Sequence, residues 1–278
     1  METNKTGQYI YHYTSEEGLM GILNNGEGYN DIIDQKELFV QNGYRLNEKN
    51  GRIWATHSDF FKDTEELHYG LKFIQRFVDK LDEKYNRTGS SRYLTWDYFS
   101  SVTALKEYYI ASFSTLFNDH YLWKSYANNG EGYMLVFNKD KWKRLGEWKI
   151  CTYGSEKLIE WFDFQKLYPM ISQSIGNHPI LLQEIFEKSL CFKSEEFINE
   201  REYRFIMNNT GISPTLFRKG DGCLIPYRNI KFNISDIEQI WVGQNNPDPI
   251  GARKVLDKMR RKLEMNFEIK CSSIPYNE

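Results

Sequence analysis

The sequence has few of the features that mark a secreted, disulfide-bonded or membrane protein. Its 278 residues include four cysteines, which lie far apart and form no C-x-x-C pair. The first ten residues, METNKTGQYI, lack the apolar run of a secretory signal. No window approaches the roughly 20 apolar residues that span a bilayer. We therefore expect reduced thiols, a cytoplasmic location and no membrane partner.

A large excess of charge of one sign is also missing. The formal net charge is −2, so no global basic field attracts nucleic acid, and only a local patch could do so. The chain contains no H-E-x-x-H, P-loop, G-x-G-x-x-G or G-x-S-x-G motif. Histidines and cysteines do not cluster as metal ligands do, so we predict no metal site of that kind. Function is therefore to be sought in a pocket built from other polar side chains.

Hydrophobic residues make up 40% of the chain and aromatic residues 16%, which is enough for a substantial core. We predict a single domain over residues 1–278, with helical insertions at about 63–106 and 155–190. Strand and helix patterns follow one another without internal repeats. They favour an α+β fold in which a mainly antiparallel, curved sheet surrounds a cleft and helices flank it.

The period of the apolar residues places the individual elements. Strands are predicted at Tyr9–Thr14, Ile53–Thr56, Tyr108–Ser114, Tyr133–Phe137, Cys191–Lys193, Glu200–Met207, Cys223–Tyr227, Ile237–Val242 and Asn266–Cys271. Helices are predicted after Thr14, from Asp63, at His120–Ala127, within Glu156–Leu190 and at about Pro249–Leu263. Thr14 and Glu17 have the spacing of a capping box at the start of the first helix.

Three charged residues alternate along the predicted strand Glu200–Met207. Strand parity puts Glu200, Glu202 and Arg204 on one face and Tyr203 with Phe205 on the other, core-facing side. A cross-strand ladder of salt bridges is one interpretation. The other is a cleft-lining site, in which two repelling carboxylates and an arginine perturb one another's pKa values.

Polar residues also lie at the ends of the other strands. His12 and Thr14 share a face of the first strand where it meets a helix. Ser112 and Ser114 end a middle strand. Trp123 and Tyr126 follow on a short helix, where they are either core residues or a stacking surface for a nicotinamide or nucleobase ring.

The acidic residues around the long helix have two interpretations. Asp63 suits its N-cap, and Glu65 and Glu66 suit the positive end of its dipole. Alternatively, Asp63 and Glu66 could converge with Glu200 and Glu202 on a divalent cation. That arrangement would favour a hydrolase or nuclease.

Taken in order, these motifs resemble the bacterial domain-of-unknown-function 2971 family over nearly the whole chain. They are H-x-T with L-x-x-I-L, F-x-D-x-x-E, S-F-S…L-W-x-x-Y-A…G, and K…E-x-E-x-R from Lys193 to Arg204. That family is in turn similar to the ADP-ribosyltransferase fold. The resemblance implies cleavage of the nicotinamide–ribose bond of NAD, with Glu202 or Glu200 as the essential acid.

The same resemblance assigns roles to the remaining residues. It implies that His12, Thr14, Ser112 or Ser114, and Tyr126 contact the dinucleotide, with Tyr13 standing where many transferases have a glycine. Lys193 and Arg204 would hold Glu202 or meet the pyrophosphate.

The sequence leaves the acceptor open among protein, nucleic acid, a small molecule and water, and it carries no signal for the oligomeric state. Bacterial transferases of this kind often serve as toxins or in antiphage defence. A non-catalytic nucleotide-sensing domain is the alternative from another functional class.

Overall fold

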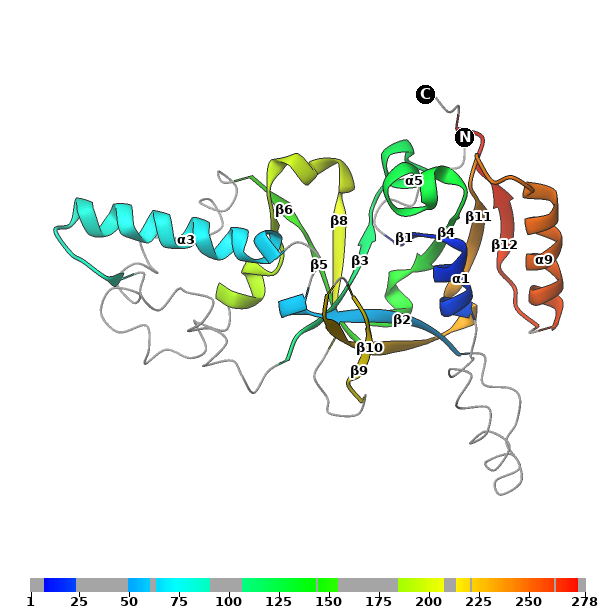
Figure 1. The fold of residues 1–278 in the computed structure, drawn as a ribbon, viewed down its shortest axis with the longest axis horizontal. Coiled ribbons are helices and arrows are strands. Elements are labelled where there is room, and N and C mark those ends of the chain that lie inside the picture. Colours follow the sequence, from blue (N-terminus) through cyan, green and yellow to red (C-terminus); the bar gives the residue numbers. More distant parts are fainter. Residues whose placement is uncertain are drawn as a thin grey trace, which may run out of the picture. The chain divides into compact units, whose positions relative to one another are not determined.

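The computed structural model describes residues 8–23, 50–60, 64–90, 107–143, 145–154, 185–207, 214–220, 222–262 and 264–274. These residues form a mixed α/β protein with a mainly antiparallel, open sheet and several helices (Figure 1). The chain divides into two compact units. Unit 1 comprises Met1–Trp54, Ser112–Gly146 and Asn229–Glu278, and unit 2 comprises Ala55–Ala111 and Glu147–Arg228. The single-domain interpretation stays a prediction.

Unit 1 is built on four strands and three helices. The strands are β1 (Tyr9–Thr14), β4 (Tyr133–Asn138), β11 (Ile237–Val242) and β12 (Glu268–Cys271). The helices are α1 (Glu16–Leu23), α5 (His120–Tyr126) and α9 (Pro249–Lys262). Short 3₁₀ turns lie at Asn128–Gly130, Lys139–Trp142 and Ile234–Asp236.

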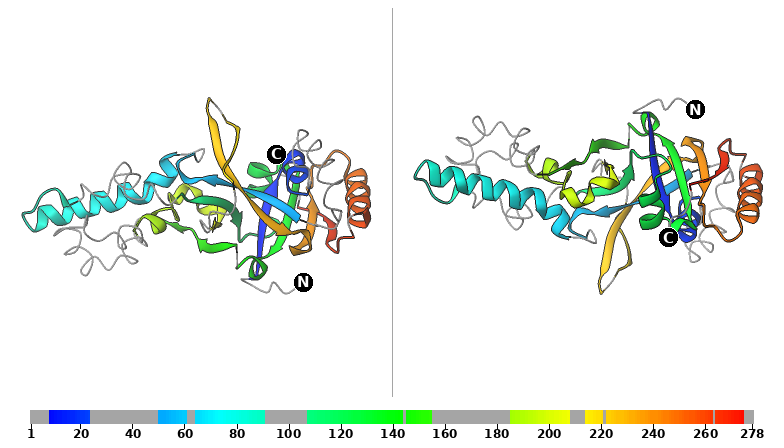
Figure 2. Two further views of the ribbon diagram at one scale, coloured as in Figure 1. Left: turned by 90° about the horizontal axis from the view of Figure 1, so that it is seen from below. Right: turned by 90° about the horizontal axis from the view of Figure 1, so that it is seen from above.

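The register of the unit 1 strands explains their burial. β4 pairs antiparallel with β1 on one side, from Tyr133↔Thr14 to Asn138↔Tyr9, and with β11 on the other side. Its first five residues are all buried, as expected of a strand covered on both faces. β12 joins β11 in parallel, and α9 lies alongside β12 in Figure 1 and in both views of Figure 2.

Aromatic side chains dominate the core of unit 1. Phe137 contacts Phe113, Trp142 and Phe232 edge-on, with ring centroids 5.2–5.9 Å apart. Trp142 also stacks on Phe232 at 5.0 Å. Such pairs contribute about 0.5–1.5 kcal/mol each beyond the burial of their area.

Unit 2 combines a long helix with short strands. α3 spans Thr64–Lys84, and the strands are β5 (Gly146–Ile150), β6 (Thr152–Tyr153), β7 (Phe192–Lys193), β8 (Glu202–Met207) and β9 (Leu216–Lys219). Two 3₁₀ turns lie at Ser58–Phe60 and Glu195–Glu200. α3 packs on β7 through Gly70, where an added Cβ would lie 3.0 Å from the Cβ of Phe192.

Four of the described strands begin in one unit and end in the other. They are β5, of which only Gly146 belongs to unit 1, and β2 (Asn50–His57), β3 (Tyr109–Ser114) and β10 (Leu224–Asn233). Within unit 2, β3 pairs antiparallel with β2 at Ile110↔Thr56, β10 pairs with β9, and β8 pairs with β5.

Most of the predicted elements are confirmed. β1 and β11 have the predicted bounds, and the other predicted strands and helices differ by a few residues at their ends. β5, β6 and β9 were not predicted. Of the predicted helical stretch Glu156–Leu190, only residues 185–190 lie in the part that the structure describes, and 185–189 are helical.

The predicted cap of the first helix is wrong by one residue. Ser15, not Thr14, caps α1, because the Gly18 N–H donates to Ser15 Oγ at 3.2 Å. Thr14 is buried instead, and a Cβ added to Gly18 would lie 1.9 Å from Thr14 Oγ1. The predicted N-cap of the long helix, Asp63, lies outside the described residues.

Candidate functional site

Four charged side chains form a buried cluster in unit 2. Lys193 Nζ donates to Glu200 Oε2 and, at 2.8 Å, to Glu202 Oε2. Arg204 binds the same carboxylate from the other side, with Nε 2.9 Å from Oε1 and Nη2 3.1 Å from Oε2. All four residues are at most 5% exposed. Two cations and two anions therefore neutralise one another in a buried setting.

Glu200 enters this cluster from a 3₁₀ turn, whereas the alternation of side chains along a strand placed it on β8. Glu200 ends the 3₁₀ turn Glu195–Glu200, and Arg201 follows in the left-handed region at φ 43°. β8 begins only at Glu202. The prediction that Glu200 belongs to the strand is therefore wrong, although its carboxylate still meets Lys193.

Neighbouring backbone groups hold Glu202 in position. Its N–H donates to Tyr153 Oη at 2.7 Å, and its carbonyl accepts from the Cys151 N–H at 3.0 Å. Arg204 also donates through Nη1 to the carbonyl of Leu190. The guanidinium is thus fixed at both ends, which limits the orientations open to the carboxylate it binds.

The electrostatics of the cluster keep Glu202 ionised. Burial alone would raise its pKa, but the charges of Arg204 and Lys193 and their hydrogen bonds outweigh burial and lower the pKa from 4.5 to about 2. The pKa values of the two nearby thiols shift in the opposite direction, upward. Burial raises the pKa of Cys191 to about 11 and that of Cys151 well above its usual value. The cluster therefore provides a permanent carboxylate and no reactive thiolate.

Glu202 retains one hydrogen-bonding position. A carboxylate oxygen has two lone pairs, and Oε2 uses both on Lys193 and Arg204. Oε1 accepts a single hydrogen bond, from Arg204 Nε, within the described part of the chain. One lone pair on Oε1 is therefore available to a donor from a ligand.

The opposite face of β8 packs as predicted. Phe205 is fully buried and meets Trp148 edge-on at 4.7 Å. Tyr203 is partly buried and stacks on the same indole at 5.7 Å. The parity argument is confirmed from Glu202 onward.

His12 is the central polar residue of the second group, in unit 1. Its Nδ1 lies 3.1 Å from the carbonyl oxygen of Ser112, and its ring contacts Phe113 at 5.3 Å. Burial lowers its pKa below 6.5, and the hydrogen bond to Ser112 only partly offsets this. At neutral pH the ring is uncharged, Nδ1 carries the proton donated to Ser112, and Nε2 is an acceptor.

The predicted residues around His12 serve mainly to support the unit 1 core. Tyr13 Oη donates to the Leu116 carbonyl at 3.0 Å, and its ring meets Trp123 edge-on at 5.3 Å. Trp123 is fully buried, which agrees with a core role. Ser114 Oγ accepts from the Leu116 N–H at 3.0 Å. Burial raises the pKa of Tyr13, so its hydroxyl remains protonated.

Two of the predicted ligand-contacting side chains are accessible. Ser112 is exposed on β3, and Tyr126 is 48% exposed at the end of α5. Tyr126 is therefore placed to stack on a planar ring, whereas Trp123 is not.

The predicted site residues thus fall into two groups. Unit 1 holds His12, Tyr13, Thr14, Ser112, Ser114, Trp123 and Tyr126, and unit 2 holds Lys193, Glu200, Glu202 and Arg204. The structure brings the four unit 2 residues into one cluster, and in unit 1 it pairs His12 with Ser112 and Tyr13 with Trp123. A shared site stays a prediction. Asp63 and the side chain of Glu66 lie outside the described residues. Within those residues, no three His, Cys, Asp or Glu side chains are grouped to hold a metal ion.

Sequence reasoning missed Tyr153 and a close crossing of glycine loops in unit 1. The Gly243 N–H donates to the Gly132 carbonyl at 2.9 Å, and a Cβ on Gly243 would lie 2.0 Å from the Gly130 oxygen. Asn245 Nδ2 also donates to the Asn129 carbonyl at 2.6 Å. The two Asn-Asn motifs, at 128–129 and 245–246, are the sequence signal that could have paired these loops.

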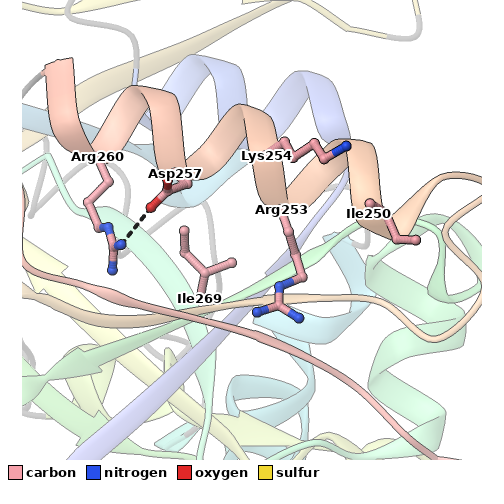
Figure 3. A pocket seen from close by; sticks show the side chains of 6 residues that line it. All are labelled: Ile250, Arg253, Lys254, Asp257, Arg260 and Ile269. Atoms are coloured by element: carbon pink, nitrogen blue, oxygen red, sulfur yellow. Dashed lines mark hydrogen bonds and ion pairs between the residues drawn. The ribbon is translucent and has the colours of Figure 1, made fainter.

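A hollow of about 400 Å³ lies between α9 and β12 in unit 1 (Figure 3). It is lined by Ile250, Arg253, Lys254, Asp257, Arg260 and Ile269. Figure 3 shows Arg253 and Arg260 extending from α9 on the side of Ile269, with Arg260 paired to Asp257 at 2.5 Å. None of these lining residues was predicted to be functional.

The chain was compared with protein-family models, curated proteins and solved structures, and nothing matches it in any of the three. In the described part of the chain, no helix combines the length and the apolar character needed to cross a membrane.

Proposed function

We propose that the protein is an NAD-dependent enzyme similar to ADP-ribosyltransferases and to the domain-of-unknown-function 2971 family. It would cleave the nicotinamide–ribose bond and pass the ADP-ribosyl group to an acceptor, in a toxin or antiphage-defence role. The observation that carries the proposal is the state of Glu202, a carboxylate held ionised by Lys193 and Arg204 with one lone pair of Oε1 unused.

The proposed reaction needs a fixed negative charge. When the glycosidic bond breaks, its electron pair leaves with nicotinamide, and the ribose becomes an oxocarbenium-like cation. A nucleophile of the acceptor then bonds to that carbon and releases its proton to solvent. A carboxylate that accepts a hydrogen bond from a ribose hydroxyl stabilises the cation, and Glu202 meets this requirement without having to lose a proton.

His12 supplies the second element of the proposal. Its uncharged ring donates through Nδ1 to Ser112 and has no described contact at Nε2, so Nε2 can accept a hydrogen bond from a ligand hydroxyl. Tyr126 offers an exposed ring for the nicotinamide or adenine. All four cysteines are free, which supports a cytoplasmic setting for the reaction.

The test is release of nicotinamide from NAD by the purified protein, measured by chromatography, followed by mass spectrometry of candidate acceptors. Glu202→Gln should lower the rate about 10²-fold or more, because the amide cannot supply a full negative charge. Glu202→Asp, which keeps the charge, should retain more activity than Glu202→Gln. Glu268→Gln on exposed β12 is the matched control and should leave the rate unchanged.

Each variant must be compared at a temperature where circular dichroism shows that it is folded. If folded Glu202→Gln releases nicotinamide at the wild-type rate while Glu200→Gln does not, the essential acid is Glu200. If neither substitution lowers the rate, the transferase proposal fails. The cluster would then be a structural ion-pair network.

A further inference from the structure

Helix α9 carries a strong local charge on a protein that is slightly acidic as a whole. Its sequence, PIGARKVLDKMRRK, contains six basic residues and one acidic residue, a net charge of +5, against −2 for the whole chain. The long helix α3 is a useful contrast. It contains four basic and five acidic residues, a net charge of −1. The charge of α9 is therefore a property of that helix and not of helices in this protein generally.

The basic side chains of α9 are free to meet a partner. Arg253, Lys254 and Lys258 are exposed, and within the described part of unit 1 none of them has an ion pair or hydrogen bond. Asp257 is already occupied by Arg260 at 2.5 Å and by Arg261 at 2.6 Å. The helix thus presents positive charge that the protein itself does not neutralise.

We propose that the basic face of α9, defined by Arg253, Lys254, Lys258 and Arg261, binds the phosphate backbone of nucleic acid. This inference does not depend on the proposed transferase activity. The four residues span eight positions, or about 12 Å of helix axis at 1.5 Å per residue. Each DNA strand carries one phosphate per about 3.4 Å of duplex axis. A row of cations about 12 Å long is therefore long enough to meet more than one phosphate.

The composition of the face also favours phosphate as the anion. Arg253 has no described partner, and its planar guanidinium matches phosphate in a two-pronged geometry. Arg261 shares the carboxylate of Asp257 with Arg260. Arg253 borders the hollow beside β12, which gives a phosphate room to sit between the helix and the strand (Figure 3).

A membrane surface fits the same face less well. Helices that lie on membranes insert a continuous apolar face, but the apolar side of α9 is already buried in unit 1 through Leu256. The exposed apolar residues Ile250 and Val255 are 67% and 56% exposed. They are separated by about 140° around the helix at 3.6 residues per turn, so they form no single inserting stripe.

An acidic protein partner also fits less well. Stable protein interfaces contain an apolar or aromatic centre surrounded by polar residues. The basic face of α9 contains no aromatic residue that could form such a centre.

The test is fluorescence anisotropy with a labelled 20-base-pair duplex and a labelled 20-nucleotide single strand. If three phosphates are neutralised, the affinity should fall about 40-fold between 50 and 200 mM salt. The variant Arg253→Gln/Lys254→Gln/Lys258→Gln should weaken binding at least about tenfold at 100 mM salt and flatten the salt dependence. Because these side chains have no described partner, the variant should fold normally.

The matched control removes the same charge from the other helix. Arg76, Lys80 and Lys84 are exposed on α3 at helical spacing, and replacing all three by glutamine should leave binding within about twofold of wild type. Equal losses in the two triple variants would overturn the proposal, because total charge alone would then explain binding.

Two further probes separate the alternative partners. The nucleic-acid assignment would be overturned if vesicles containing anionic phospholipid bound the protein more tightly than DNA does. It would also be overturned if polyglutamate displaced DNA from the protein at equal charge concentration. Failure of both DNA probes to bind at 50 mM salt would also overturn it.

Discussion

Acid should remove a defined part of the protein's stability through Glu202. Its pKa is lowered from 4.5 to about 2 in the folded protein, a shift worth about 3 kcal/mol at 1.36 kcal/mol per unit. Because the folded pKa is the lower one, this stability is fully present above about pH 4.5. It should fall by about 1 kcal/mol at pH 3.5 and by about 3 kcal/mol at pH 2.

The variant Glu202→Gln isolates this contribution from that of the other carboxylates. At pH 7 it should be less stable than wild type by about 3–5 kcal/mol, because it leaves Lys193 and Arg204 without their counter-charge. The difference should narrow as pH falls, because Glu202 of the unfolded wild type then gains a proton while Glu202 of the folded protein stays ionised, which favours unfolding of wild type but not of the variant. Urea unfolding followed by tryptophan fluorescence at pH 7, 5 and 3.5 measures the difference directly.

The control for this experiment is Glu268→Gln. Glu268 is exposed and pairs with Lys270 at 3.1 Å, so its difference from wild type should stay within about 0.5 kcal/mol at all three pH values. A gap between wild type and Glu202→Gln that is constant from pH 7 to pH 3.5 would refute the reasoning. Glu202 would then titrate normally, and the cluster would not hold it ionised.

Two further outcomes are expected. Trp123→Ala should destabilise unit 1 by about 3–5 kcal/mol because the indole is fully buried, whereas Tyr126→Ala should change the melting temperature little; similar losses would show that Tyr126 is also a core residue. In a titration with a thiol reagent under native conditions, exposed Cys223 should react first, and buried Cys151 and Cys191 only on unfolding. Rapid reaction of all thiols would contradict the burial of the cluster.

The sequence predicted the fold best where a strand or helix has a clear period. β1 and β11 were placed with their observed bounds, since both segments are rich in aromatic and β-branched residues. β5 was missed because only its Trp148 and Ile150 carry the strand pattern, between charged residues. This five-residue strand is defined by its pairing with β8, and the sequence of the segment alone does not reveal that pairing.

The candidate site was predicted in part for the same reason. The association of Glu202 with Arg204 follows from strand parity, and both are in the cluster. The position of Glu200 does not follow from parity, because the left-handed conformation of Arg201 delays the start of β8 until Glu202. Lys193 then reaches the Glu200 carboxylate from β7. Tertiary contacts of this kind override local preference.

The pairing of β4 has a consequence for synthesis on the ribosome. β4 ends at Asn138, and its second partner, β11, begins at Ile237. About 100 residues, including most of unit 2, must therefore be made first, which takes about 5–20 s at 5–20 residues per second. During that interval the apolar edge of β4 is unpaired on the β11 side and open to the wrong strand. A holding chaperone bound to this nascent intermediate would increase the yield of folded protein.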